Sequence, residues 1–360
     1  MGVVCPEEII RHKQDCSIFH IQLMLNRKSL LDILITLFLF LVTPTPAISQ
    51  TLAGSFRVME YNVENLFDSD HDSLKMDTQF TPDGDYHWTH GRYWRKLNAI
   101  SRSIVLASTD SLTLRLPDII GLCEVENDSV LMSLTRRSLL RGARYEYVMT
   151  ASPDLRGIDV ALLYQPMTFR CISHHPLRVD LLPSMRPTRD ILYVKGETLY
   201  GDLHVYVVHA PSRSGGEKLT RPHRMAVMTR LLSSIDSLCS VEPSPRIIVM
   251  GDFNDYSADK SLRRLSAAGL VEISAPGYLT ASPDVRGTYR YQGVWGSLDH
   301  IFISSSLLPF FSRSRVSAPS ELLEPDTRYG GMKPFRYMRG PIYNGGYSDH
   351  LPLVADFMFP

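Results

Sequence analysis

Runs of apolar residues that end in a polar side chain recur along the chain and predict its strands. Residues 247–250 are consecutive apolar residues, the pattern of a strand buried on both faces, and Gly251, Asp252 and Asn254 follow directly. Similar runs or strict alternation predict strands near 55–61, 117–125, 145–150, 157–164, 203–209, 299–303 and 352–357. Apolar positions three or four residues apart predict helices from Gly91 onward and over 129–140, 221–238 and 260–270.

These helices and strands are expected to build two stacked sheets. Some strands alternate with helices, whereas others follow one another directly. This mix favours two stacked sheets with helices outside over a single doubly wound sheet. Segments 69–85 and 304–339 are rich in turn-forming and charged residues and are expected to be irregular surface loops.

The N-terminal segment has the composition of an export signal. Two basic residues precede an apolar run over 30–42, and small residues follow up to Ser49. This order is typical of a secretory signal peptide, and the run is short for a membrane span. We expect residues 1–49 to be a leader, with the true start possibly at Met24, and residues 50–360 to form a single domain. The protein is then secreted or periplasmic, with an uncleaved anchor as the alternative.

Charge and cysteine content narrow the class of protein only slightly. The chain has 38 basic and 38 acidic residues, so no global basic field attracts nucleic acid, although a local basic cleft is compatible with this sum. Cys123, Cys171 and Cys239 follow the leader, too few for a disulfide framework. Cys123 lies in an apolar strand and is expected to be a small core residue. No Cys/His spacing suggests structural zinc.

Acidic, amide or histidine side chains stand at six predicted strand ends. They are Asn62 and Glu64, Glu124, His209, Asp252 and Asn254, Asp299, and Asp349 with His350. Taken alone, Asp252 and Asn254 equally fit an ordinary Asx turn, and His209 fits a surface histidine. Repeated at several strand ends, however, carboxylates, amides and imidazoles indicate a site that suits Mg²⁺ or Mn²⁺ and a substrate phosphate.

The motifs around these residues resemble those of a known superfamily. Asn62-Val63-Glu64, Glu124-Val125-Glu126, Gly251-Asp252-Phe253-Asn254, Ser297-Leu298-Asp299-His300 and Ser348-Asp349-His350-Leu351-Pro352 are similar, in sequence and order, to the motif series of the endonuclease/exonuclease/phosphatase superfamily. The resemblance spans nearly all of the chain after the leader. It implies a DNase-like four-layer α/β sandwich, with two stacked mixed β-sheets flanked by helices, and metal-dependent phosphoester hydrolysis.

The resemblance also implies a metal site. Glu124 would be the principal ligand of Mg²⁺ or Mn²⁺. Glu64 and Asp349 would assist directly or through water, and Asn62 would complete the metal-binding set.

The remaining motif residues would carry out the hydrolysis. Asp252 would orient or deprotonate the attacking water, and Asn254 would hold a phosphate oxygen. His350 would contact the phosphate or act as acid or base, with its ring fixed by Asp299. His209 would be a second proton donor or phosphate ligand.

Further residues give candidate phosphate contacts and argue against one class of substrate. Ser212 and Arg92 are candidate contacts to a substrate phosphate. Arg92, Arg95 and Lys96 are otherwise expected to form the solvated face of their helix. Some apurinic endonucleases have an amide where Ser212 stands, and that branch tends to an aromatic residue where His300 stands. Both differences argue against a role in DNA repair.

Three functions stay open on the sequence alone. The expected one is a secreted nuclease that hydrolyses phosphodiester bonds of nucleic acid. The second is a phosphatase or phosphodiesterase for a small-molecule or lipid substrate, which zero net charge mildly favours. The third, a non-catalytic binding protein on the same scaffold, is disfavoured by the complete set of acids and histidines. In each case we expect a monomer with no membrane span after signal cleavage.

Overall fold

Two large sheets form the centre of the computed structural model, which describes residues 54–109, 114–183, 185–280 and 284–360. The first contains β1 (Ser55–Leu66), β2 (Ile119–Val125), β3 (Glu146–Met149), β4 (Asp159–Tyr164), β10 (Leu279–Thr280), β14 (Phe311–Val316) and β19 (Leu353–Met358). The second contains β5 (Phe169–Leu177), β6 (Ile191–Thr198), β7 (Gly201–His209), β8 (Ile247–Asp252), β9 (Leu270–Glu272) and β13 (Asp299–Ser304). The predicted leader lies outside the described residues.

Both sheets are mixed. The strand order is β10-β14-β19-β1-β2-β4-β3 in the first sheet and β5-β6-β7-β8-β13-β9 in the second. In the first, β1 is parallel to β2 and antiparallel to β19; in the second, β8 is parallel to β7 and antiparallel to β13. The expected pair of mixed sheets is therefore confirmed.

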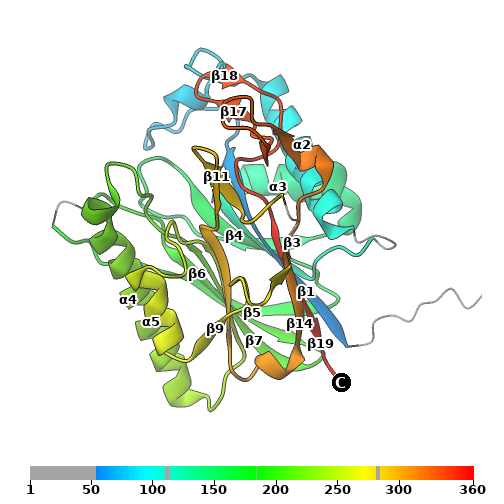
Figure 1. Ribbon diagram of the computed structural model, residues 1–360, viewed down its shortest axis with the longest axis vertical. Helices are drawn as coiled ribbons and strands as arrows, with labels where there is room; N and C mark the ends of the chain where they lie inside the picture. Colours follow the sequence, from blue (N-terminus) through cyan, green and yellow to red (C-terminus); the bar gives the residue numbers. More distant parts are fainter. Residues whose placement is uncertain (1–53, 110–113, 184, 281–283) are drawn as a thin grey trace, which may run out of the picture. The chain divides into compact units, whose positions relative to one another are not determined.

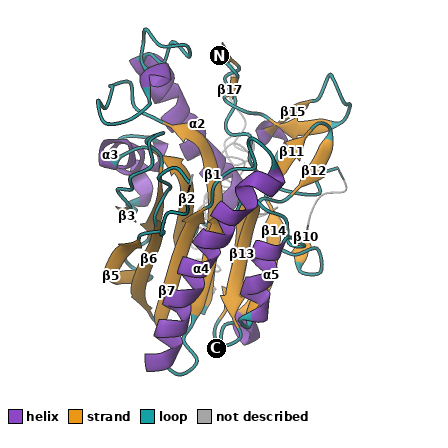
Figure 2. Ribbon diagram, turned by 90° about the vertical axis from the view of Figure 1, so that its left-hand side faces the viewer, coloured by secondary structure: helices purple, strands orange, loops and turns teal. Residues whose placement is uncertain are grey.

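Helices cover the outer face of each sheet, which gives four layers (Figures 1 and 2). The helices are α2 (His90–Ser108), α3 (Asp128–Arg136), α4 (Glu217–Val241) and α5 (Lys260–Ala267), with short 3-10 turns at Thr78–Phe80, Leu139–Ala143, Leu308–Phe310 and Ser320–Leu322. The described residues also contain three small hairpins: β11 (Tyr289–Tyr291) with β12 (Val294–Gly296), β15 (Leu323–Pro325) with β16 (Met332–Pro334), and β17 (Met338–Arg339) with β18 (Ile342–Tyr343).

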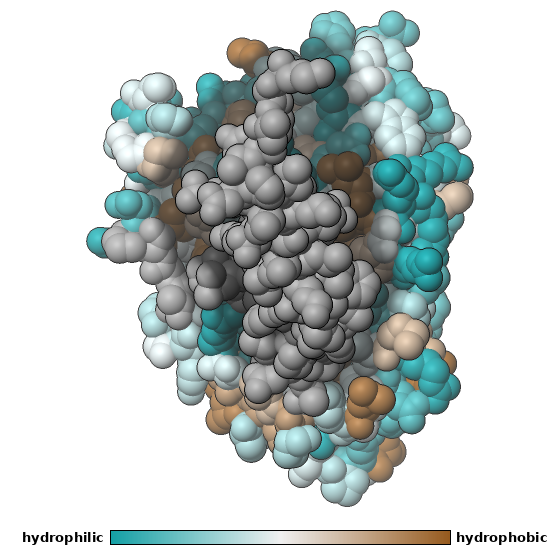
Figure 3. Space-filling view, turned by 90° about the vertical axis from the view of Figure 1, so that its right-hand side faces the viewer, coloured by the Kyte–Doolittle hydropathy of each residue, from teal (hydrophilic) through white to brown (hydrophobic). Residues whose placement is uncertain are grey.

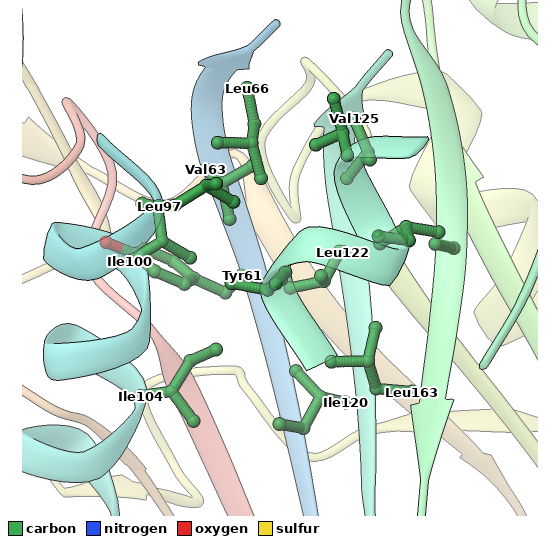
Figure 4. Packing of buried hydrophobic residues seen from close by; sticks show 14 of the residues in the cluster. Tyr61, Val63, Leu66, Leu97, Ile100, Ile104, Ile120, Leu122, Val125 and Leu163 are labelled. Carbon is green, nitrogen blue, oxygen red and sulfur yellow. The ribbon is translucent and has the colours of Figure 1, made fainter. Parts of the chain in front are cut away.

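The helix α2 packs on the first sheet through the residues that its periodicity predicts. Leu97, Ile100 and Ile104 are fully buried and meet Tyr61 of β1 and Ile120 of β2 (Figure 4). Each such side chain contributes about 1.5–3 kcal/mol of burial free energy. The expected amphipathic helix is confirmed, and it fixes the position of β1 and β2 from outside.

Alternation along β1 decides which residues face the second sheet. Met59 and Tyr61 belong to the core under α2, whereas Phe56 and Val58 belong to the core between the sheets. Side chains two apart in a strand share a face. Glu60 therefore faces the second sheet, where an apolar residue would be expected.

The segment 304–339 corrects one prediction, because it is not irregular throughout. Its residues 311–316 form β14, which pairs with β19 in the first sheet. The strand is hard to recognise because Arg313 and Arg315 interrupt its apolar pattern. In the folded chain these arginines lie against Asp356 of β19, 2.8 and 3.6 Å from its carboxylate.

Among the described residues, no helix has the length and apolar character needed to cross a bilayer. On the face shown in Figure 3, hydrophilic residues cover much of the right-hand rim and hydrophobic residues gather near the lower edge.

Candidate active site

Two β-bulges place acidic side chains at the rim of the first sheet. The pairing of β1 with β2 shifts register between Asn62 and Leu66, and that of β2 with β4 shifts at Glu124. Glu64 and Glu124 adopt positive φ angles of 50° and 67° there. A bulge redirects a side chain away from strict alternation. The backbone thus turns both carboxylates to the rim.

Asp252, at the end of β8, is the centre of the site. It is 2% exposed, and its Oδ2 accepts a hydrogen bond of 3.0 Å from Asn62 Nδ2. The Nε2 atoms of His209 and His350 lie 3.7 and 4.0 Å from the same oxygen. Burial, and then the charge of Asp299, raise the pKa of Asp252 to about 7. The structure therefore gathers four predicted site residues around the Asp252 carboxylate, which can exchange a proton near neutral pH.

The two histidines beside Asp252 have opposite protonation tendencies. His350 Nδ1 lies 2.7 Å from Asp299 Oδ2. Burial alone would lower the pKa of His350. The carboxylates of Asp299 and Asp252 outweigh burial and hold this pKa well above its ordinary value. By contrast, burial, together with Arg189, lowers the pKa of His209 well below that value. His350, whose pKa is raised, and His209, whose pKa is lowered, thus flank the Asp252 carboxylate. These opposite shifts make His350 the candidate proton donor of the site.

The turn after β8 depends on one glycine. Gly251 has φ 145°, and a Cβ there would lie 1.8 Å from Val208 O. Asn254, at φ 52°, donates its backbone N–H to Asp252 Oδ1 at 2.8 Å. That bond is an Asx turn, so the structural interpretation of this motif and the catalytic one are compatible. Asn254 Nδ2 also donates to Ala210 O at 3.0 Å, which fixes the amide beside His209.

Three further carboxylates at the rim are held by cations. Arg336 donates to Glu64 Oε1 at 3.0 Å and to Asp349 Oδ2 at 3.1 Å. Arg156 NH2 donates to Glu124 Oε2 at 3.1 Å. Burial, and then Asp349, raise the pKa of Glu64 to about 7. This acidic group therefore needs positive charge to be stable, and two arginines supply it.

Lys96 corrects the prediction that it forms part of a solvated helix face. It is fully buried; its Nζ donates to Tyr347 O at 2.5 Å and lies 4.9 Å from the centre of the Tyr337 ring. Burial lowers its pKa to about 8, while Glu64 and Asp349 oppose that shift. The helical pattern alone does not predict a buried lysine. Lys96 is buried next to Glu64 and Asp349, which are distant in sequence and favour its charged form.

The donor set fits a hard divalent cation. Glu64, Glu124 and Asp349 offer only oxygen atoms, which Mg²⁺ and Mn²⁺ prefer. Among described residues, the two groups with ligand atoms within 4.8 Å of one another are Asp252–Asp299–His350 and Glu217–Asp255–Asp259, so the rim carboxylates stand farther apart. Mg²⁺ usually keeps several waters and uses one or two carboxylates, which suits this wider spacing.

Replacement of Arg336 is expected to strengthen metal binding. Arg336→Gln removes the guanidinium that occupies Glu64 and Asp349, so an entering cation no longer has to displace it. We expect about tenfold tighter Mn²⁺ binding by electron paramagnetic resonance titration, equivalent to the loss of one charged hydrogen bond. Arg339→Gln, whose partner is Glu324, is the matched control and should leave affinity unchanged. Equal affinity in Arg336→Gln and the parent would show that Arg336 does not compete.

Glu60 is a buried acid that the sequence predictions missed. It is fully buried, and within the described residues neither carboxylate oxygen has a hydrogen-bond partner. Burial, then Asp299 and Asp252, raise its pKa well above 4.5. The sequence does contain a sign of this buried acid, because Glu60 interrupts the apolar run of β1. Its side chain lies below the rim, next to the charges of the site.

Removing the Glu60 carboxyl is expected to stabilise the protein increasingly as pH rises. The folded protein keeps the proton, whereas the unfolded chain loses it above about 4.5, so the parent loses stability with rising pH. Glu60→Leu should therefore gain about 1–3 kcal/mol at pH 8 and less at pH 5. Urea unfolding in EDTA measures this difference. A gain independent of pH would contradict the protonation argument.

Six of the predicted catalytic and metal-binding residues line one open cleft of about 800 Å³, whereas Asn62, Glu64 and Asp299 are not among its lining residues. Glu124, His209, Asp252, Asn254, Asp349 and His350 line it, as do Ser212 and the arginines Arg156, Arg186 and Arg189. Arg92 is not among the lining residues; its guanidinium lies 4.9 Å from the centre of the Tyr343 ring and donates to Tyr86 O. Of the two candidate phosphate contacts, the structure thus places Ser212 at the cleft and Arg92 outside it.

The fold and this site define a metal-dependent phosphoric ester hydrolase. The profile of the Endonuclease/Exonuclease/phosphatase family matches residues 57–358, and the chain belongs to this family. The resemblance noted from the sequence motifs is thereby confirmed. A search of curated proteins gave no match.

Solved structures share the fold at low sequence identity. A Bacteroides thetaiotaomicron endonuclease/exonuclease/phosphatase family protein is 18% identical, with TM-score 0.55, over 85% of this chain and 98% of that one. The mannosyl-6-phosphatase of the same organism is 16% identical, with TM-score 0.54, over 84% and 100%. Truncated Caenorhabditis elegans TDP2 is 16% identical, with TM-score 0.53, over 84% and 97%.

Proposed function

We propose that this protein is an exported Mg²⁺- or Mn²⁺-dependent nuclease that hydrolyses phosphodiester bonds of nucleic acid. One observation carries the proposal: Asp252, His209 and His350 line the same open cleft as Arg156, Arg186 and Arg189. The surroundings shift the pKa values of the two histidines in opposite directions. A nuclease also contacts phosphates on either side of the one it cleaves. Such contacts with basic side chains supply most of its sequence-independent affinity for nucleic acid.

Each residue has a role in this proposal. Asp252 takes the proton of the attacking water. His350, charged and held by Asp299, donates a proton or a hydrogen bond to the phosphate ester. His209 and Asn254 hold phosphate oxygens with neutral hydrogen bonds. Such acid–base assistance is worth about 10²–10⁴-fold in rate.

The bound cation would be held by Glu64, Glu124 and Asp349, with Asn62 beside them. When bound, it supplies positive charge against the phosphate oxygens. Asn62 serves mainly through Asp252, because its amide donates to that carboxylate.

A phosphatase for a small phosphoester is the second candidate. The cleft of about 800 Å³ lies within the roughly 300–1,000 Å³ typical of small-molecule sites. A mannosyl-6-phosphatase is also among the proteins of similar fold.

Substrate and salt dependence test the proposal. Purified protein is incubated with plasmid DNA, RNA, sphingomyelin and bis(p-nitrophenyl) phosphate, with Mg²⁺ or with EDTA. The proposal expects nucleic acid to be cut only with Mg²⁺, and cleavage to weaken steeply as salt rises. Hydrolysis of small phosphoesters alone, with little salt dependence, would favour the phosphatase.

Export and a monomeric state also belong to the proposal. Residues 1–49, on which export rests, lie outside the described structure. N-terminal sequencing of protein recovered from the cell exterior or periplasm is expected to begin after Ser49, and size-exclusion chromatography with light scattering is expected to give a monomer.

A further inference from the structure

A second pocket, of about 190 Å³, opens beside the catalytic cleft. Tyr289 and Asp349 line both spaces, so the two are neighbours. Four basic residues line the second pocket, Arg290, Arg328, Lys333 and Arg336, against the two acids Asp326 and Asp349. We call it the basic pocket.

Part of this positive charge is already used. Arg336 pairs with Glu64 and Asp349. Arg290 NH1 lies 3.3 Å from Asp326 Oδ2 and donates to Met332 O at 2.6 Å. Asp326 and Asp349, the two acids that line the pocket, are therefore already paired with Arg290 and Arg336.

Arg328 and Lys333 are the remaining cations of the pocket. Arg328 is exposed, with its guanidinium 5.1 Å from the centre of the Tyr329 ring. Lys333 Nζ forms a long ion pair with Glu324 Oε1, at 3.9 Å, which is beyond hydrogen-bond distance. An anion in the pocket therefore competes only with this long pair for Lys333, while Arg328 is exposed at the pocket.

Hydrogen bonds hold the turn beside the pocket, and a buried arginine lines it. Asp326 Oδ1 accepts the backbone N–H groups of Arg328 and Tyr329, each at 3.1 Å, which fixes the turn between β15 and β16. The Arg290 side chain is only 7% exposed, and its Nε has no hydrogen-bond partner among the described residues. A buried guanidinium N–H left without a partner costs free energy unless a ligand satisfies it.

We propose that the basic pocket binds a second phosphate of the substrate, next to the phosphate that is cleaved. Arg328 and Lys333 supply the charge and Arg290 Nε a fixed donor, while Tyr289 and Tyr329 offer aromatic walls on which a base can stack. The inference rests on the proposed nuclease function, because a nucleic-acid backbone presents phosphates on both sides of the scissile bond.

Binding measurements test this subsite separately from catalysis. The measurements use the full chain with Asp252→Asn and Mg²⁺, because this substitution is expected to slow hydrolysis while binding is measured. Fluorescence anisotropy follows the binding of a labelled single-stranded 12-nucleotide DNA. Arg328→Gln with Lys333→Gln is expected to weaken binding about tenfold and to flatten the slope of log affinity against log salt by about 1.4. Arg170→Gln with Lys195→Gln, which removes the same charge from β5 and β6, is the matched control and should leave both values unchanged.

A nucleoside 3′,5′-bisphosphate is the second probe and distinguishes the sources of the phosphate. Weakened binding of the 12-mer supports the inference, whether or not the bisphosphate is affected. Weakened binding of the bisphosphate alone keeps the phosphate subsite but overturns its nucleic-acid source. Equal affinity and salt slope in the Arg328/Lys333 variant and the control overturn the subsite. Cleavage of nucleic acid by the parent, measured independently, would then still support the proposed function.

Discussion

An Asp252→Asn enzyme is expected to hydrolyse phosphodiesters about 10²- to 10⁴-fold more slowly than the parent. Asparagine keeps the shape of the side chain and the oxygen that accepts the Asn254 backbone N–H. It cannot take a proton from water, and it removes the negative charge that helps to hold His350 protonated. The loss should therefore fall on kcat, with thermal unfolding close to that of the parent.

The control for this variant is an aspartate outside the cleft. Asp202 pairs with Lys195 on the second sheet, 2.7 Å apart. Asp202→Asn removes one negative charge and should leave kcat within a factor of about two, since exposed ion pairs contribute little. If Asp252→Asn keeps more than a tenth of the parent's rate, another group must be the base.

Loss of the Glu124 carboxylate is expected to weaken metal binding at least 10- to 100-fold, because loss of a residue that only supports a metal ligand already has an effect of this size. Glu124→Gln keeps an oxygen but loses the charge that balances a divalent cation. Isothermal titration with Mn²⁺ measures the affinity directly, without reference to any substrate. The parent should also lose all hydrolysis in EDTA and regain it when the metal is restored.

Glu126 gives a closely matched control, because it belongs to the same Glu-Val-Glu motif. In the structure its Oε2 accepts the backbone N–H of Asp68 at 2.7 Å, and it does not line the cleft. Glu126→Gln should therefore leave Mn²⁺ affinity unchanged. Equal losses in the two variants would remove the distinction between these acids.

Much of the fold could be predicted because hydrophobic periodicity reports burial directly. The runs at 247–250 and 119–123 became fully buried strands, and Cys123 is a core residue as expected. Strands without that signal were missed. Most of β5 is exposed at a sheet edge, and the arginines in β14 disguise its pattern. Both strands bury only a few of their side chains, so their hydrophobic pattern is weak, although the backbone of each pairs with a neighbouring strand.

The same distinction between local and long-range information applies to the site. Residues at strand ends could be predicted, because their position follows from local pattern alone. The cations around them could not, because a local pattern does not show which acid a cation will meet: Arg336 and Glu64, for example, are 272 residues apart. Lys96 was misplaced for this reason. Glu60 was recognisable in principle, since an acid within an apolar strand needs an explanation.

The backbone of the site bears on how this protein can evolve. Glu64, Asn65, Glu124 and Asn254 all have φ between 50° and 67°, a conformation that costs about 1–3 kcal/mol for most residues and almost nothing for glycine. A library selected only for heat resistance should therefore accumulate glycine at these positions and lose its chemistry as it gains robustness. Improvement by directed evolution would need selection for turnover from the first round.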